Sequence, residues 1–89
     1  MRFIDKMVVS QIGDVWFAVS VGNKEGSTSK TVRLNSTGKV IFDCLQEGKT
    51  AEEIADYLTE KYEVDMETAI ESAQDVINIL KDNGIIIED

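Results

Sequence analysis

The sequence predicts an α+β domain of the winged helix-turn-helix-like kind, in which a three-stranded antiparallel sheet precedes a three-helix bundle. Three observations support this class. A β-hairpin pattern fills residues 6–21, a four-residue strand pattern follows at 31–34, and three capped amphipathic helices occupy most of the remainder. Because the chain has only 89 residues, we expect residues 1–89 to form one domain around one core.

The hairpin is predicted from its turn. Gly13-Asp14 is a two-residue turn of a kind that hairpins favour, and runs rich in Val, Ile, Phe and Trp flank it. Counting outward from this turn assigns two faces. One face holds Val8, Ser10, Ile12, Val15, Phe17 and Val19, and the other holds Val9, Gln11, Trp16 and Ala18. The first face is the more apolar, so we expect it to cover the core.

A short third strand follows a polar connection. Residues 22–30 are glycine-rich and aperiodic, and their length indicates tolerance of insertion more than a functional role. In the next four residues Val32 and Leu34 point one way, and Thr31 and Arg33 point the other. This strand is expected to pair with the second strand. Its far edge then has no partner unless the C-terminal segment 85–87 supplies one.

Each helix is predicted from a cap and an apolar stripe. The first runs over residues 36–46 after Asn35 or Ser36, and the second follows a capping box at residues 50–53. The third runs from residue 66 to 82 or 83, before Gly84. Its expected buried stripe is Met66, Ala69, Ile70, Ala73, Val76, Ile77 and Leu80. Ile79 lies on a flank with Ser72 and Asn83, which is either ordinary surface or one wall of a groove.

Composition excludes several kinds of site. The chain has one cysteine, Cys44, and no histidine, so one chain cannot build a disulfide framework, a Cys/His zinc site or a cysteine–histidine nucleophile pair. There is no glycine-rich phosphate loop either, and we expect no cofactor, no metal and no enzymatic activity. No apolar run is long enough for a membrane span or a signal peptide, which favours a cytoplasmic protein without membrane contact.

The charge distribution argues against nucleic acid as a partner. The net charge is −8, and it is concentrated in residues 50–89, where two Lys/Arg stand against twelve Asp/Glu. The third helix would present Glu67, Glu71 and Asp75 to a DNA groove and only Lys81 as a cation. Phosphate would be repelled. A winged-helix DNA-binding or transcription-associated module is thus only the alternative hypothesis for this fold. A protein–protein adaptor without a peptide ligand is a third hypothesis.

The unpaired edge of the third strand offers a different route to function. Its free N–H and C=O groups are a template for an extended peptide, which would add to the sheet as a further strand. About four or five such bonds at a net ~1 kcal/mol each barely cover an association cost of ~4–15 kcal/mol. Apolar anchors are required, and Val76 and Ile79 on the third helix are candidates to supply them.

The order and spacing of these patterns resemble the PqqD family. The likeness rests on residues 34–38 with Ile41, Phe42 and Leu45, then 50–55, 62–64, 75–76, 79–80 and 84–86, and it spans nearly the whole chain. The resemblance implies a recognition element for ribosomally made peptides. Such an element binds the leader segment of a precursor peptide between the third strand and third helix, and it presents the leader to a modifying enzyme, often a radical SAM protein.

Carried over position by position, the resemblance assigns the peptide-binding residues. They are Thr31, Val32, Arg33 and Leu34 on the strand, and Ser72, Val76, Ile79 and Asn83 on the helix. The longer connection at residues 22–30 departs from the family's usual form. The expected partners are a leader peptide and a radical SAM or other peptide-modifying enzyme. A homodimer through the open sheet edge is a further expectation.

Overall fold

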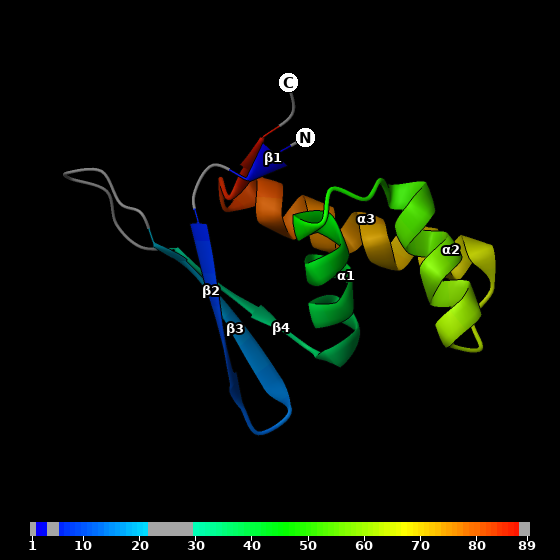
Figure 1. The fold of residues 1–89 in the computed structure, drawn as a ribbon, viewed down its shortest axis with the longest axis horizontal. Coiled ribbons are helices and arrows are strands. Elements are labelled where there is room, and N and C mark those ends of the chain that lie inside the picture. Colours follow the sequence, from blue (N-terminus) through cyan, green and yellow to red (C-terminus); the bar gives the residue numbers. More distant parts are fainter. Residues whose placement is uncertain (1, 4–5, 22–29, 88–89) are drawn as a thin grey trace.

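The fold joins a three-stranded sheet to three helices. The computed structural model describes residues 2–3, 6–21 and 30–87, so residues 22–29 of the expected connection at 22–30 lie outside the described residues. Strands β2, β3 and β4 form the sheet in that order, and the helices lie to one side of it (Figure 1). The predicted α+β class is confirmed. The elements are β1 (Arg2–Phe3), β2 (Lys6–Ile12), β3 (Val15–Val21), β4 (Thr31–Leu34), α1 (Ser36–Gln46), α2 (Ala51–Lys61), α3 (Met66–Asp82) and β5 (Ile86–Ile87).

The hairpin forms with the predicted register, but the opposite face covers the core. Ile12 pairs with Val15 and Val8 pairs with Val19, as the turn requires. Yet Val8 and Ile12 are 47% and 69% exposed, whereas Ala18 is fully buried. The expectation that the Val8–Ile12–Phe17 face covers the core was therefore wrong.

Strand β4 explains which face turns inward. Its two buried residues, Val32 and Leu34, pair with Ala18 and Trp16 on β3. Residues opposite each other across antiparallel strands share a face, so burying Val32 and Leu34 forces Ala18 and Trp16 inward as well. Helix α1 packs against β3 and β4 and covers this side. The buried face of the hairpin is thus determined by its contacts with β4 and α1. It is not determined by which face has more apolar residues.

All three helices begin at a side-chain cap. The Asn35 side chain accepts a hydrogen bond from the Gly38 N–H at 2.8 Å, and Thr50 and Glu53 form a reciprocal capping box. The Asp65 carboxylate accepts from the Thr68 N–H, and hydrogen bonding to the Thr68 side chain and backbone lowers the pKa of Asp65. These caps satisfy donors that the first turn of a helix leaves free.

The buried stripe of α3 is narrower than its sequence predicts. Val76, Ile77 and Leu80 are buried, as are Ala69 and Ala73. By contrast, the side chains of Met66 and Ile70 are 42% and 41% exposed, so their expected burial was wrong. Helix α2 packs against α3. The larger apolar side chains at the margin of the stripe are left outside the contact.

A second, two-stranded sheet joins the chain ends. Strand β1 pairs antiparallel with β5, and the sequence did not predict this pairing. It brings the Phe3 ring edge-on to the buried Phe42 ring, with 5.5 Å between centroids. Strand β5 belongs to this second sheet and is not hydrogen-bonded to β4. In the described part of the chain, no helix is long and apolar enough to cross a membrane.

Candidate functional site

The outer edge of β4 carries backbone groups that point away from the sheet. The Ser20 N–H donates to the Lys30 carbonyl at 2.8 Å, and the Lys30 N–H donates to the Ser20 hydroxyl. Hydrogen-bonded and non-bonded pairs alternate along antiparallel strands. Val32 and Leu34 therefore bond to β3, while the N–H and C=O groups of Thr31 and Arg33 point to the open edge. No described strand occupies that edge.

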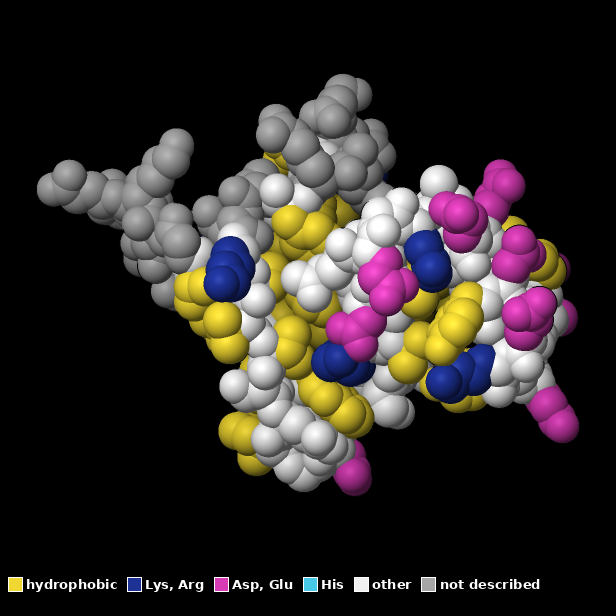
Figure 2. Space-filling model, in the orientation of Figure 1, with side chains coloured by type: hydrophobic (Ala, Val, Ile, Leu, Met, Phe, Trp, Pro, Cys, Tyr) yellow, Lys and Arg dark blue, Asp and Glu magenta, His cyan; other side chains and the backbone are white. Residues whose placement is uncertain are grey.

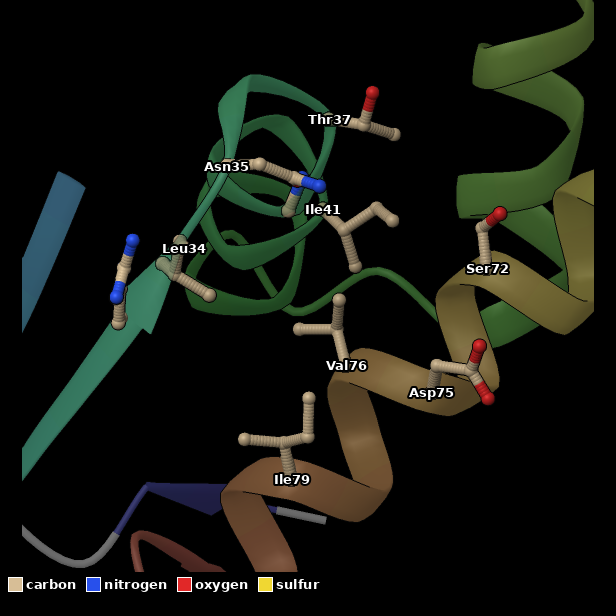
Figure 3. Close-up of a pocket in the computed structure, with 10 residues that line it drawn as sticks. Leu34, Asn35, Thr37, Ile41, Ser72, Asp75, Val76 and Ile79 are labelled. Atoms are coloured by element: carbon tan, nitrogen blue, oxygen red, sulfur yellow. The ribbon is translucent and has the colours of Figure 1, made fainter. Parts of the chain in front are cut away.

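A hollow of about 360 Å³ lies beside this edge, where β4, the start of α1 and the middle of α3 meet. Figure 3 shows Leu34 and Ile41 facing Val76 and Ile79 across it. The volume falls within the ~300–1,000 Å³ range of ligand pockets. Its lining residues are Arg33, Leu34, Asn35, Thr37, Gly38, Ile41, Ser72, Asp75, Val76 and Ile79.

The floor of the hollow is apolar, and its exposed rim carries both apolar and polar side chains. Leu34, Ile41 and Val76 are all more than nine-tenths buried, so they form a fixed apolar base. Ile79 belongs to the rim, because 42% of its surface is exposed. Ser72 and the exposed Asp75 are also part of the lining, from the preceding turns of α3. The site can bury an apolar side chain while a backbone runs along the open edge of β4.

Gly38 lets α1 start close to β4. A Cβ atom there would lie 3.1 Å from the Asn35 Oδ1 and 3.4 Å from a Leu34 methyl carbon. A larger residue would press on both the helix cap and the wall of the hollow. Close packing therefore favours glycine at position 38, where β4, the cap of α1 and the hollow meet.

The structure places the predicted binding residues in different environments. Arg33, Leu34, Ser72, Val76 and Ile79 line the hollow.

The remaining predicted residues lie outside this lining. Thr31 is exposed on β4, and Val32 is 3% exposed and belongs to the core. Asn83 ends α3, where its side-chain amide donates to the Ile79 carbonyl at 2.8 Å.

Sequence reasoning missed one wall of the hollow. Asn35, Thr37, Gly38 and Ile41 come from the cap and start of α1, and Asp75 comes from α3; the sequence assigned none of them to the binding site. Gly38 in the first turn, three residues after the cap residue Asn35, was the signal in the sequence that could have revealed this wall.

Cys44 is a buried free cysteine in α1. The thiol is 5% exposed, and burial raises its pKa, so it stays protonated at neutral pH. The described residues include no cluster of His, Cys, Asp or Glu that could hold a metal ion. The hollow at the β4 edge is the leading candidate site, because it combines apolar contacts with open backbone groups of β4.

Comparison with known proteins identifies the family. The chain resembles the solved structure of TbiB1 in complex with the TbiA(beta) leader peptide, with 26% identity, a TM-score of 0.74 and full coverage of both chains. A lasso peptide synthetase B1 complexed with its leader peptide has the same fold, with a TM-score of 0.77, 24% identity and coverage of 98% and 96%. No curated protein matches the chain. The family described as coenzyme PQQ synthesis protein D (PqqD) matches residues 23–86, and the chain belongs to the PqqD family.

Proposed function

We propose that this protein binds the leader segment of a ribosomally made precursor peptide as an added strand on β4. The observation that supports this most is the open edge beside an apolar hollow. Thr31 and Arg33 direct two N–H and two C=O groups to the side where Val76 and Ile79 offer apolar contacts. An extended peptide can use both at once, with its backbone on the strand and alternate side chains in the hollow.

The energetics require both parts of the site. About four backbone hydrogen bonds at a net ~1 kcal/mol each only match the low end of an association cost of ~4–15 kcal/mol. Burying one leucine-sized side chain adds about 1.5–3 kcal/mol. A leader with one or two apolar side chains spaced two residues apart fits the site best, because alternate residues of a strand face the same way.

Both structural relatives are complexes with leader peptides, and this supports the same ligand class for this chain. We propose that the protein presents its leader to a peptide-modifying enzyme and performs no catalysis itself. A radical SAM enzyme is our expected partner class. The place of action is expected to be the cytoplasm, where ribosomal precursor peptides are made.

The exposed side chains of α3 argue against the alternative hypothesis of DNA binding. The helix that would enter a groove, α3, exposes Glu67, Glu71 and Asp75. These carboxylates would face phosphates, and the basic groups that nucleic-acid affinity needs are scarce there.

The open edge of β4 could also pair with the same edge of a second copy of this chain. A second copy would use the same Thr31 and Arg33 groups as the leader, so we expect the leader to displace any such dimer.

Arg33→Pro tests the strand-addition mode. Proline removes the outward N–H and places its ring where the leader backbone would lie, while an edge position tolerates the residue. We expect leader affinity to fall at least about tenfold, which corresponds to about 1.4 kcal/mol. Isothermal titration calorimetry with the leader encoded beside this chain measures the change.

Arg33→Thr is the matched control, because it removes the charge and keeps the N–H. Its leader affinity is expected to stay within about threefold of the unaltered protein, a change below about 1 kcal/mol. Circular dichroism checks that both variants fold. A folded Arg33→Pro variant with unchanged affinity would contradict strand addition, as would an equal loss in both variants.

A further inference from the structure

The outer face of the three-stranded sheet is apolar and is not packed against the core. Its residues are those on the far side from α1. They are Lys6, Val8, Ser10, Ile12, Val15, Phe17, Val19, Val21, Thr31 and Arg33. Val15, Phe17, Val19 and Val21 are half-buried, yet none of them packs against the hydrophobic core. Val8 and Ile12 on the same face are 47% and 69% exposed, so the described part of this outer face retains exposed apolar surface.

The charge of the outer face is opposite to that of the rest of the molecule. Its only charged residues within β2, β3 and β4 are Lys6 and Arg33, and both are positive. The whole chain has a net charge of −8. Figure 2 shows that the acidic side chains gather mostly over the helical side. An apolar face with a basic rim on an acidic protein is complementary to an apolar patch rimmed by carboxylates.

We propose that the outer face docks the peptide-modifying enzyme, through an apolar patch on that enzyme rimmed by Asp and Glu. This inference rests on the proposed leader-binding function. A second copy of this chain is a poorer occupant. Two outer faces in contact would set Lys6 and Arg33 of both copies against surfaces whose described strand residues include no carboxylate.

A bound leader would enlarge the docking surface. The leader strand pairs with the edge groups of Thr31 and Arg33, and alternate leader side chains then point to the outer face beside those two residues. The face spans three strands of at most seven residues. Its flat footprint is therefore on the order of 300 Å², well below the ~800 Å² that a stable interface takes from each partner. The enzyme would bind the empty protein weakly and the leader-loaded protein more tightly.

Val8→Glu tests this surface, because Val8 is 47% exposed and lies near the middle of β2 on the outer face. The substitution removes apolar surface and places a carboxylate against the acidic rim of the enzyme. Biolayer interferometry would use the purified modifying enzyme encoded beside this chain, with and without saturating leader. We expect saturating leader to raise enzyme affinity at least tenfold, and Val8→Glu to lower it at least tenfold in the presence of leader. Val8→Lys adds a positive charge like those of Lys6 and Arg33, so we expect it to lower enzyme affinity less than Val8→Glu does.

Val64→Glu is the matched control. It makes the same substitution at a residue that is 38% exposed and lies between α2 and α3, on neither binding surface. We expect it to leave enzyme affinity and leader affinity within twofold of the unaltered protein. Val8→Glu should also keep leader affinity within twofold, because Val8 lies on β2 and the leader binds at β4.

Three results would overturn the docking proposal. The first is a Val8→Glu variant that binds leader normally and binds the enzyme as tightly as the unaltered protein. The second is enzyme affinity that does not respond to leader. The third is a dimer in sedimentation velocity that Val8→Glu converts to monomer while enzyme affinity stays the same, since the face would then serve a second copy. Failure of the unaltered protein to bind leader at all would instead overturn the proposed function.

Discussion

Ile79→Glu is expected to weaken leader binding on the order of 100-fold, which is about 2.7 kcal/mol, with little change in the thermal midpoint. Ile79 is 42% exposed and lines the hollow beside β4. In the free protein the new carboxylate stays in water, so folding loses little. In the complex it would be covered by an apolar leader side chain, and burying an unpaired charge is far more costly than burying a methyl group. Calorimetric titration and thermal unfolding together measure the two effects.

Ile70→Glu provides a close control for this prediction. Ile70 lies on the same helix with 41% exposure, but it does not line the hollow. The same substitution there is expected to change leader affinity less than threefold, below about 1 kcal/mol. If Ile79→Glu lowered the thermal midpoint by more than about 10 °C, more than about 1 kcal/mol for a domain this size, Ile79 would be a core residue. Equal losses of affinity in both variants would contradict its role in the site.

Phe42→Ala is expected to destabilise the fold by about 3–5 kcal/mol. Phe42 is fully buried in α1, and the Phe3 ring meets it edge-on. Small domains have a total stability of only about 5–15 kcal/mol, so this single cavity removes a large share. Urea unfolding followed by circular dichroism measures the loss. A change below about 1.5 kcal/mol, under half the smallest value expected for such a cavity, would show that the site can collapse around the missing ring.

The local structure was predictable from the sequence because local rules determine it. A two-residue turn at Gly13-Asp14 sets the register of the hairpin, and side-chain caps at Asn35, Thr50 and Asp65 set where the helices begin. These signals act within a few residues, so they do not depend on the rest of the fold.

Features that depend on distant contacts were not predictable in the same way. The buried face of the hairpin follows from its pairing with Val32 and Leu34, and counting apolar residues gave the wrong face. The pairing of β1 with β5 joins segments at opposite ends of the sequence, and two-residue strands leave no periodic pattern. The β4–α3 side of the site was expected, but the wall supplied by α1 was not, because no residue of that helix was assigned to the binding site.

The most direct test is the hydrogen exchange of individual β4 amides, measured by NMR with and without leader. In the free protein, Thr31 and Arg33 should exchange quickly, whereas Val32 and Leu34 are protected by β3. Saturating leader is expected to slow exchange at Thr31 and Arg33 at least tenfold and to leave Val32 and Leu34 nearly unchanged. A leader that binds tightly while Thr31 and Arg33 exchange as fast as before would contradict strand addition at this edge.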